Sequence, residues 1–540
     1  MFMVEMKEFT FVFSGEAFIK TIIYFAVIFL IVMIFNTFSI SKVKVIDLLT
    51  ANKKNEDLKV KKLGVSVVWF LISVACIGFA YHCIRENGMV DGQFWMSIIF
   101  GTIGTFLFFL SLSGFFLRIL KTNKKFYYRK LNMFILRQIN SKITTTFVSM
   151  TLLCLMLLVA IGVFSTGAGL ATTMGGDMKK ATPYDVSYIK YLPEEEKNYK
   201  VQADMRKEFE SKGIDMNKFV DKSCMISTRL YGKLKFKVFL NGRDRFVDYP
   251  KGVKASMGKS SPEIIGLSDY NEAMRKQGKQ TISLKSNEYA VNCNFDNMKK
   301  LWEDVCKDRV EIKMDGRTLT AKSSMIDSTY YSASSLPMDM GTLIVPDDVA
   351  EKIPVHTVVY NCQLKGDAEE NTHKLSKLME SVYPNKTMEE RNKAPYHTAV
   401  YRVEMIEQSA GLSTVITYIA IYIGAVFLIT CAAVLALQQL SENSDNVERY
   451  NLLRKIGADE RMINHAMLAQ IIIYFMVPLS LALVHSYIGV KVASNVIATL
   501  GNVNALNGIL ASGGAILVIY GGYMLATYLG SKAVIKDKNR

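Results

Sequence analysis

The chain has 540 residues, of which 50% are hydrophobic, and its apolar residues are gathered into long blocks. This composition excludes an ordinary soluble globular protein and indicates an integral membrane protein. The formal net charge of +16 is typical of basic loops and anionic-lipid contacts, and no basic stripe interleaved with aromatic residues suggests a nucleic-acid partner.

The apolar blocks predict seven transmembrane helices, because each block is long enough to cross about 30 Å of hydrocarbon. The run 412–441 contains no charged residue at all. The predicted spans are 18–35, 63–81, 94–117, 147–170, 412–437, 466–488 and 509–529.

Basic residues orient these spans through the positive-inside bias. They fill the loops after the first and third spans, so both loops are predicted to be cytoplasmic, and alternation then places 171–408 outside and 442–465 inside. The basic residues are Lys42, Lys44, Lys53, Lys54, Lys59, Lys61 and Lys62 in one loop, Lys121, Lys124, Lys125, Arg129, Lys130, Arg137 and Lys142 in the other, and Lys532, Lys536, Lys538 and Arg540 in an internal C-terminal tail.

An odd number of spans with an internal C-terminus puts Met1 outside the membrane. Residues 1–15 nevertheless do not resemble a signal peptide. We therefore expect a chain that is truncated at its N-terminus, or misannotated, so that in-frame hydrophobic segments would be found upstream in the DNA.

Residues 171–408 predict an α+β domain that is large enough to bury a core of its own. Alternating apolar residues at 231–240 predict a half-buried strand, and two runs within 309–322 flank Asp315 and Gly316, a turn dipeptide typical of tight hairpins. Helices are predicted at 194–212 and 370–382, and Asp347 and Asp348 after Pro346 indicate a helix start rather than an acid and a base.

The polar stretch 443–463 directly follows the fifth span. It predicts a short exposed amphipathic helix between two spans, which suits docking into a groove on a soluble protein. Apolar residues would fill the groove, arginines would fix the register, and Gly457 would allow close approach or end a helix turn. The alternative is a solvated connector with positive-inside arginines. The predicted contact residues are Arg449, Tyr450, Leu453, Arg454, Lys455, Ile456, Gly457 and Asp459.

Three features of the last spans have both structural and functional interpretations. Pro478 would kink the sixth span, either as a hinge or as a tolerated structural proline. His485 is predicted near the outer interface, where an imidazole meets water and headgroups, and no proton relay is assigned to it. The small residues predicted to permit close helix packing in the last span are Gly513, Gly514, Gly521 and Gly522.

No motif for catalysis or metal binding occurs in the sequence. It has no G-x-x-x-x-G-K-[ST] loop, so any ATP must be bound and hydrolysed by another polypeptide. It also has no nucleophile elbow, C-x-x-C pair or histidine cluster, so we predict neither a catalytic residue nor a metal site. Cysteines in the predicted external domain allow two disulfides in three pairings, and they are Cys224, Cys293, Cys306 and Cys362.

Three segments resemble a known family of membrane proteins. They are LSDYNEAMRKQGKQTISLKSNEYAV from residue 267, GTLIVPDDVAEKI from residue 341, and GAVFLITCAAVLALQQLSENSDNVERYNLLRKIGADERMINHAML from residue 424. They are similar to FtsX-like ABC transporter permeases of the bacitracin-export, BceB-like group, and the resemblance extends over nearly the whole chain. By the family pattern the first three transmembrane helices are missing.

The resemblance implies a non-catalytic permease subunit that confers resistance to cell-envelope-active peptide antibiotics. Its expected partners are a separate ATPase subunit, as a dimer that binds ATP and magnesium, a membrane histidine kinase through which transport is sensed, and membrane lipid. Its expected ligand is a peptide antibiotic or a lipid-linked cell-wall precursor. The 443–463 helix would contact the ATPase.

The family pattern divides the chain into an N-terminal remnant, a helical hairpin, an external domain and a C-terminal FtsX-like domain. One alternative function is signalling without transport, in which the same motion regulates a kinase or a cell-wall hydrolase, and another is a fragment without function. The expected divisions are 1–37 for the last helix of a truncated half-domain, 38–62 for a cytoplasmic loop, 63–146 for the hairpin and basic loop, 147–170 for a span, 171–408 for the external domain and 409–540 for three spans.

Overall fold

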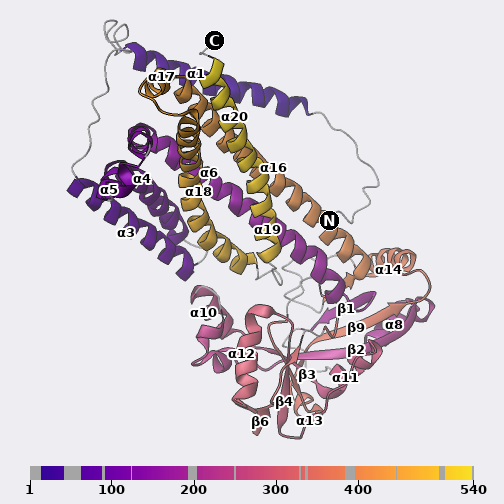
Figure 1. Ribbon diagram of the computed structural model, residues 1–540. Helices are drawn as coiled ribbons and strands as arrows, with labels where there is room; N and C mark the ends of the chain where they lie inside the picture. Colours follow the sequence, from indigo (N-terminus) through magenta and orange to yellow (C-terminus); the bar gives the residue numbers. More distant parts are fainter. Residues whose placement is uncertain are drawn as a thin grey trace.

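The computed structural model describes residues 14–41, 63–87, 92–122, 124–129, 131–192, 204–247, 251–327, 330–334, 339–383, 396–445, 447–497 and 505–537. Figure 1 shows a bundle of long helices beside a domain built on a β-sheet. This sheet domain is formed by the chain between α6 and α16.

Seven described segments are long and apolar enough to cross a membrane, which confirms the predicted number and order of spans. The last span consists of two helices joined by a π-helical turn at Ile516–Tyr520. The long helices are α1 (Gly15–Ser41), α3 (Leu63–Asn87), α4 (Gly92–Thr122), α6 (Asn132–Ala181), α16 (Arg402–Asp445), α18 (Glu460–Ile497), α19 (Ala505–Ala515) and α20 (Gly521–Asp537), and the short ones outside the sheet domain are α5 (Lys124–Tyr127) and α17 (Val447–Lys455).

Helix α6 lies at the centre of the bundle, where it packs against α4, α16, α18 and α19. Glycines permit the closest of these approaches, since a Cβ placed on Gly167 would lie 2.2 Å from the Cβ of Ala420, and one on Gly508 would lie 2.2 Å from the carbonyl oxygen of Ser165. Small residues therefore bring α16 and α19 against α6. In contrast, the large apolar side chains of α1 are exposed along its length, as expected of a helix that lipid would solvate.

Two predictions about the last spans are wrong. The glycines predicted to pack closely, Gly513, Gly514, Gly521 and Gly522, face open space, because a Cβ at each would meet nothing within 4 Å. His485 is not at an exposed interface either. It is 7% exposed, and its ring nitrogens lie 2.6 Å from the Tyr81 hydroxyl on α3 and 3.1 Å from the Thr105 hydroxyl on α4, because the hairpin α3–α4 packs over α18 there.

The described strands of the sheet domain form a mixed ten-stranded sheet with the strand order β10-β1-β9-β2-β3-β8-β4-β6-β5 and with β7 paired to β4. Neighbours from β10 to β3 are antiparallel, whereas β3–β8 and β4–β6 are parallel. The strands are β1 (Val186–Tyr191), β2 (Val220–Leu230), β3 (Glu263–Gly266), β4 (Glu288–Cys293), β5 (Glu311–Met314), β6 (Arg317–Ala321), β7 (Ile326–Asp327), β8 (Thr342–Val345), β9 (Val355–Leu364) and β10 (Tyr396–Tyr401).

Helices cover both faces of this sheet. Successive side chains of β9 point to opposite faces and so show which helices lie on which face. Val358 belongs to the cluster that contains Phe209 of α8 and Leu375 of α14, whereas Val359 belongs to the cluster of α11. A third cluster centres on Trp302 of α12. The helices are α8 (Met205–Ser211), α9 (Lys237–Leu240), α10 (Lys251–Lys259), α11 (Leu267–Lys276), α12 (Asp296–Lys307), α13 (Asp347–Ala350) and α14 (Ala368–Val382), with 3-10 turns at Met216–Lys218 and Asp244–Phe246.

Several local predictions for this domain are confirmed. Strands β5 and β6 form the predicted hairpin, and Asp315 and Gly316 have φ values of 46° and 79°, as a two-residue primed turn requires. Helix α14 forms and buries Leu375 and Met379. Helix α13 begins at Asp347, as its acidic first turn indicated.

The strand predicted at 231–240 is wrong. The strand β2 ends at Leu230, and the chain then turns into α9. The physical reason is packing: Phe236, Phe239 and Leu240 are buried at helical spacing, with the ring centroid of Phe239 lying 4.8 Å from that of Trp302. Contact with this tryptophan outweighs the alternation of the sequence.

The continuous helix predicted at 194–212 is also wrong at its centre. Asp204 has non-helical backbone angles, and its carboxylate accepts a hydrogen bond from the Lys207 amide, so it caps α8 rather than continuing an earlier helix. The part of the prediction from 194 to 203 lies outside the described residues.

The four cysteines of the sheet domain, which were allowed two disulfides by their number, are free thiols, as are the other four cysteines of the chain. Cys224 and Cys362 lie on neighbouring strands but belong to clusters on opposite faces of the sheet. Cys293 and Cys306 are buried in the cluster around Trp302. These four side chains therefore act as small apolar residues.

Candidate functional site

The predicted docking stretch folds as two helices with a tight turn between them. Helix α17 ends at Lys455, and Gly457 follows with a φ of +93°. The amide of Gly457 donates to the carbonyl oxygen of Arg454 at 3.0 Å, and that of Ala458 donates to the carbonyl of Leu453 at 3.0 Å. These are the bonds of a Schellman motif. The predicted continuous helix at 443–463 is therefore wrong, whereas Gly457 ends a helix turn as predicted.

Tyr450 points into the bundle rather than toward a partner. It is 1% exposed, its hydroxyl donates to Gln470 Oε1 at 3.3 Å, and its ring centroid lies 5.8 Å from that of Phe134. Burial raises the pKa of Tyr450 to about 12. Leu453 is half-buried against the same core. The structure therefore corrects the prediction that Tyr450 and Leu453 contact a partner, because both side chains anchor α17 to the bundle core.

The face of α17 and its turn that points away from the bundle is apolar at two positions. Ile456 is 79% exposed and Leu452 is 60% exposed. The predicted contact residues Arg449, Lys455, Gly457 and Asp459 are exposed beside them. We call Leu452 and Ile456 with these exposed neighbours the α17 face. The sequence-based prediction omitted Leu452, because either side of this short helix offers apolar residues and only the packing of Tyr450 shows which side is free.

Arg454 is engaged within the chain. Its Nε lies 2.6 Å from Glu460 Oε1, and its Nη1 donates to Asn451 Oδ1 at 2.7 Å. This pairing crosses the turn at Gly457 and joins the end of α17 to the first turn of α18. Arg454 therefore stabilises the shape of the α17 face.

The bundle and the sheet domain are joined by two direct connections. Helix α6 ends at Ala181 just before β1, and β10 ends at Tyr401 just before α16. Strands β1 and β10 are neighbours, with Val186 opposite Tyr401. The two packed helices therefore continue as two paired strands.

An ion pair closes this junction. The Nη1 of Arg402 lies 2.8 Å from Asp185 Oδ1, and its Nε donates to the carbonyl oxygen of Thr182 at 2.9 Å. The other oxygen of Asp185 accepts from the amide of Leu364 on β9 at 2.7 Å. The first residue of α16 is thus tied to the end of α6 and to the sheet.

Helix α16 links this junction to the α17 face. It has 44 residues, which at 1.5 Å per residue corresponds to about 66 Å. Figure 1 shows α17 at the end of the bundle away from the sheet domain. A displacement at the end of α16 next to α17 would therefore reach β10 through one continuous helix.

The described residues offer little evidence for other kinds of site. No group of three or more potential metal ligands occurs within them. Helix α18 runs through Pro478 as one helix. Non-helical backbone angles occur instead at Thr146 in α6, whose hydroxyl bonds that of Tyr474. A hinge at Pro478 stays a prediction.

No family model matches the chain. It is similar to an uncharacterized ABC transporter permease, YvcS, of Bacillus subtilis, with 20% identity over 497 residues that cover 89% of this chain and 71% of the relative. It is 22% identical to the bacitracin export permease protein BceB of the same organism over 518 residues, which cover 89% and 70% of the two chains. The ABC transporter permease protein YxdM of Bacillus subtilis is 21% identical over 430 residues, or 79% and 62%.

These similarities extend through the spans and the sheet domain, and the seven apolar helices agree with them. The chain is therefore a homologue of the ABC transporter permeases, a group that includes bacitracin export permeases.

Proposed function

We propose that this chain is the permease subunit of an ABC transporter that confers resistance to cell-envelope-active peptide antibiotics and takes part in sensing them. A separate ATPase dimer would supply ATP and magnesium chemistry. The sheet domain would face the outside of the cell membrane, and α17 and the C-terminus would face the cytoplasm. A membrane histidine kinase would receive the signal, and lipid-linked cell-wall precursor would accompany the peptide.

The observation that carries this proposal is the single long helix α16, which runs from the sheet to the neighbourhood of the α17 face. Helix α16 spans most of this distance, and the Arg402–Asp185 ion pair ties its first residue to the segment that precedes β1. An ATPase that moves α17 would shift β10 against β1 and so change the shape of the sheet domain. The relative named for bacitracin export supports a peptide as the ligand.

The α17 face supplies a dock of suitable chemistry for the ATPase. Its exposed aliphatic side chains, Leu452 and Ile456, are flanked by Arg449 and Lys455, as in interfaces with an apolar centre and a charged rim. Because Arg454 and Glu460 pair across the turn, the face is held in shape before binding. Such preorganisation lowers the entropy cost of docking.

The same path also suits a second function, signalling without transport. Here the motion of the sheet domain would regulate a kinase or a cell-wall hydrolase, and no substrate would move. The two functions differ in what stimulates ATP hydrolysis: transport or substrate release requires a peptide, whereas pure signalling requires a stable complex with an enzyme.

The experiment is reconstitution of the chain with the ATPase encoded beside its gene. We expect bacitracin or a related peptide to raise ATP hydrolysis in the wild type, and we expect Arg402→Met to abolish this stimulation while the ATPase still binds. The matched control is Arg206→Met in the sheet domain, since the Arg206 side chain is 58% exposed and reaches Asp204 only at 3.9 Å. No co-purifying ATPase would refute the proposal, and a complex with a kinase or hydrolase that no peptide stimulates would favour signalling alone.

A further inference from the structure

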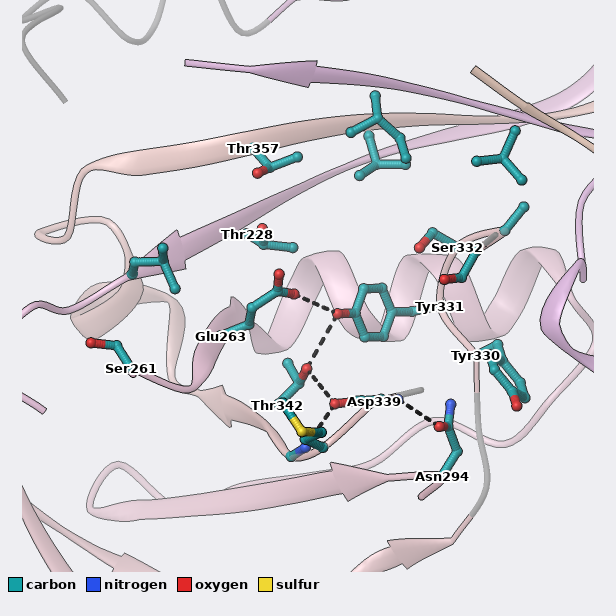
Figure 2. A pocket seen from close by; sticks show the side chains of 18 of the residues that line it. Thr228, Ser261, Glu263, Asn294, Tyr330, Tyr331, Ser332, Asp339, Thr342 and Thr357 are labelled. Atoms are coloured by element: carbon teal, nitrogen blue, oxygen red, sulfur yellow. Dashed lines mark hydrogen bonds between the residues drawn. The ribbon is translucent and has the colours of Figure 1, made fainter. Parts of the chain in front are cut away.

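A cavity of about 450 Å³ opens on the sheet domain. Its lining residues include Thr228 of β2, Glu263 of β3 and Thr357 of β9, together with the segment 330–334 and Asp339. Figure 2 shows hydrogen bonds that link Glu263 through Tyr331 and Thr342 to Asp339 in this cavity. Val358 of β9 packs with α8 and α14, and the preceding residue Thr357 points to the other face of the sheet. The cavity that Thr357 lines therefore lies on the face opposite α8 and α14.

The walls of this cavity touch the membrane helices. Tyr330 packs with Ala181 at the end of α6 and with Met405 at the start of α16. The amide of Ser334 donates to the carbonyl oxygen of Ala181 at 3.0 Å. Ser260 and Ser261 follow α10, which contacts α3. A molecule in the cavity would therefore lie beside the junction that joins the sheet to the bundle.

The charges in the cavity have one sign. Glu263 and Asp339 are acidic, and no lysine, arginine or histidine is among the described residues that line it. Tyr191, Tyr330 and Tyr331 add aromatic rings. Carboxylates beside aromatic rings form the combination that attracts organic cations, through a charge-assisted hydrogen bond and a cation–π contact.

The two carboxylates have different tasks. Asp339 accepts from Asn292 Nδ2 at 2.6 Å and from the Gly341 amide at 2.9 Å, so its oxygens hold the segment in place. Glu263 accepts from the Tyr331 hydroxyl at 2.9 Å through Oε2, and its Oε1 has no bond from another described residue. Glu263 is exposed and thus has an oxygen ready for a ligand.

We propose that this cavity binds a primary ammonium group, with Glu263 as the anionic contact and the tyrosines as its aromatic walls. The group would be carried by a basic peptide side chain or by the headgroup of an aminated lipid. The cavity volume lies within the range of about 300–1,000 Å³ typical of small-ligand sites, so it holds one side chain or headgroup rather than a whole peptide. This binding requires no ATPase and can fail or hold independently of the proposed transport function.

The test is a binding measurement on the full chain in non-ionic detergent micelles at physiological salt. The probe is an N-acetylated tetralysine peptide with a C-terminal fluorophore, followed by fluorescence anisotropy. We expect Glu263→Gln to weaken binding about tenfold or more, as loss of a charge-assisted bond implies. The charge-matched control is Glu311→Gln, because Glu311 is exposed on the edge strand β5, and it should stay within about twofold of the wild type.

A second probe isolates the ammonium group from charge-independent contacts. The same peptide with acetylated side chains should not bind measurably. Equal binding of the two peptides, or equal affinities for the wild type and Glu263→Gln, would overturn the proposal.

A lipid arm identifies the source of the group. Micelles that contain phosphatidylethanolamine should compete with tetralysine if the lipid headgroup is the occupant, whereas phosphatidylcholine, whose headgroup has no N–H donor, should not. Competition by the first lipid alone assigns the site to a lipid, and competition by neither assigns it to a peptide. Equal competition by both lipids would contradict recognition of a primary ammonium.

Discussion

Replacing the two exposed aliphatic residues of the α17 face should detach the ATPase without unfolding the permease. Fully burying a Leu or Ile side chain contributes about 1.5–3 kcal/mol. Ile456 exposes 79% and Leu452 exposes 60% of its surface, so their burial by a partner would contribute about 2–4 kcal/mol together. The double variant Leu452→Ser/Ile456→Ser should therefore weaken the ATPase complex by roughly 30- to 1,000-fold.

The assay is a titration of the purified ATPase onto the immobilised full chain in detergent. The matched control is Val238→Ser on α9, because Val238 is an aliphatic residue that is 44% exposed on the sheet domain. Thermal unfolding of both variants should match that of the wild type, since none of the replaced side chains belongs to a core cluster. An undiminished ATPase affinity in the folded double variant would refute the α17 face as the dock.

Three further predictions concern stability, each measured as the midpoint of thermal unfolding of the full chain in detergent. Gly457→Ala should destabilise the folded chain by about 1 kcal/mol, because φ at Gly457 is +93°. Gly513→Ala, in a helix where an added Cβ meets open space, should be neutral or slightly stabilising. Equal effects of the two substitutions would contradict a strained turn at Gly457. Gly341→Ala should cost about 3 kcal/mol or more, since φ is +137° and the added Cβ would lie 2.3 Å from the Trp302 ring; wild-type stability would show that the ring is not packed there. Burial raises the pKa of Asp339 from its ordinary value of 3.8 to about 7, so between these pH values the folded chain binds more protons than the unfolded chain. Stability should therefore fall as the pH rises through this window. Asp339→Asn should flatten this pH profile of stability, and an unchanged profile in that variant would contradict the assignment.

The tetralysine affinity should also depend on pH, with the opposite sign. Raising the pH from about 6 to about 8 deprotonates Asp339 and adds a negative charge to the cavity, so binding should strengthen. The groups that face Asp339 are Glu263 across the hydroxyls of Tyr331 and Thr342, and the neutral Asn292. Binding that weakens over this range would contradict an acidic cavity.

The spans were predictable because membrane insertion depends on a property that is local in sequence. A run such as 412–441 must be helical in hydrocarbon whatever its neighbours are, because only a helix satisfies its own backbone. The primed hairpin at Asp315 and Gly316 and the cap at Gly457 were predictable for a similar reason, since each depends on the backbone preferences of one or two residues.

The errors have a common cause in contacts between residues far apart in sequence. Residues 231–240 alternate like a strand, yet Trp302, some sixty positions later, selects a helix with Phe239 against its ring. The prediction for His485 fails for the same reason, since Tyr81 and Thr105, which contact its ring, lie about 400 positions away in the sequence. Propensity is a weak bias, and tertiary packing overrides it.

By itself the sequence determined a multi-span membrane protein with a large α+β insertion, a chain without a nucleotide-binding loop, and a polar segment between two spans. The tertiary structure alone decided which side of that segment is free, because Phe134 and Gln470 take up Tyr450 and leave Leu452 and Ile456 in the open. It also decided that Glu263 and Asp339 share one cavity, since strand order brings β3 and β8 together from distant parts of the chain. Periodicity describes one helix or strand, whereas a face or a cavity exists only between elements.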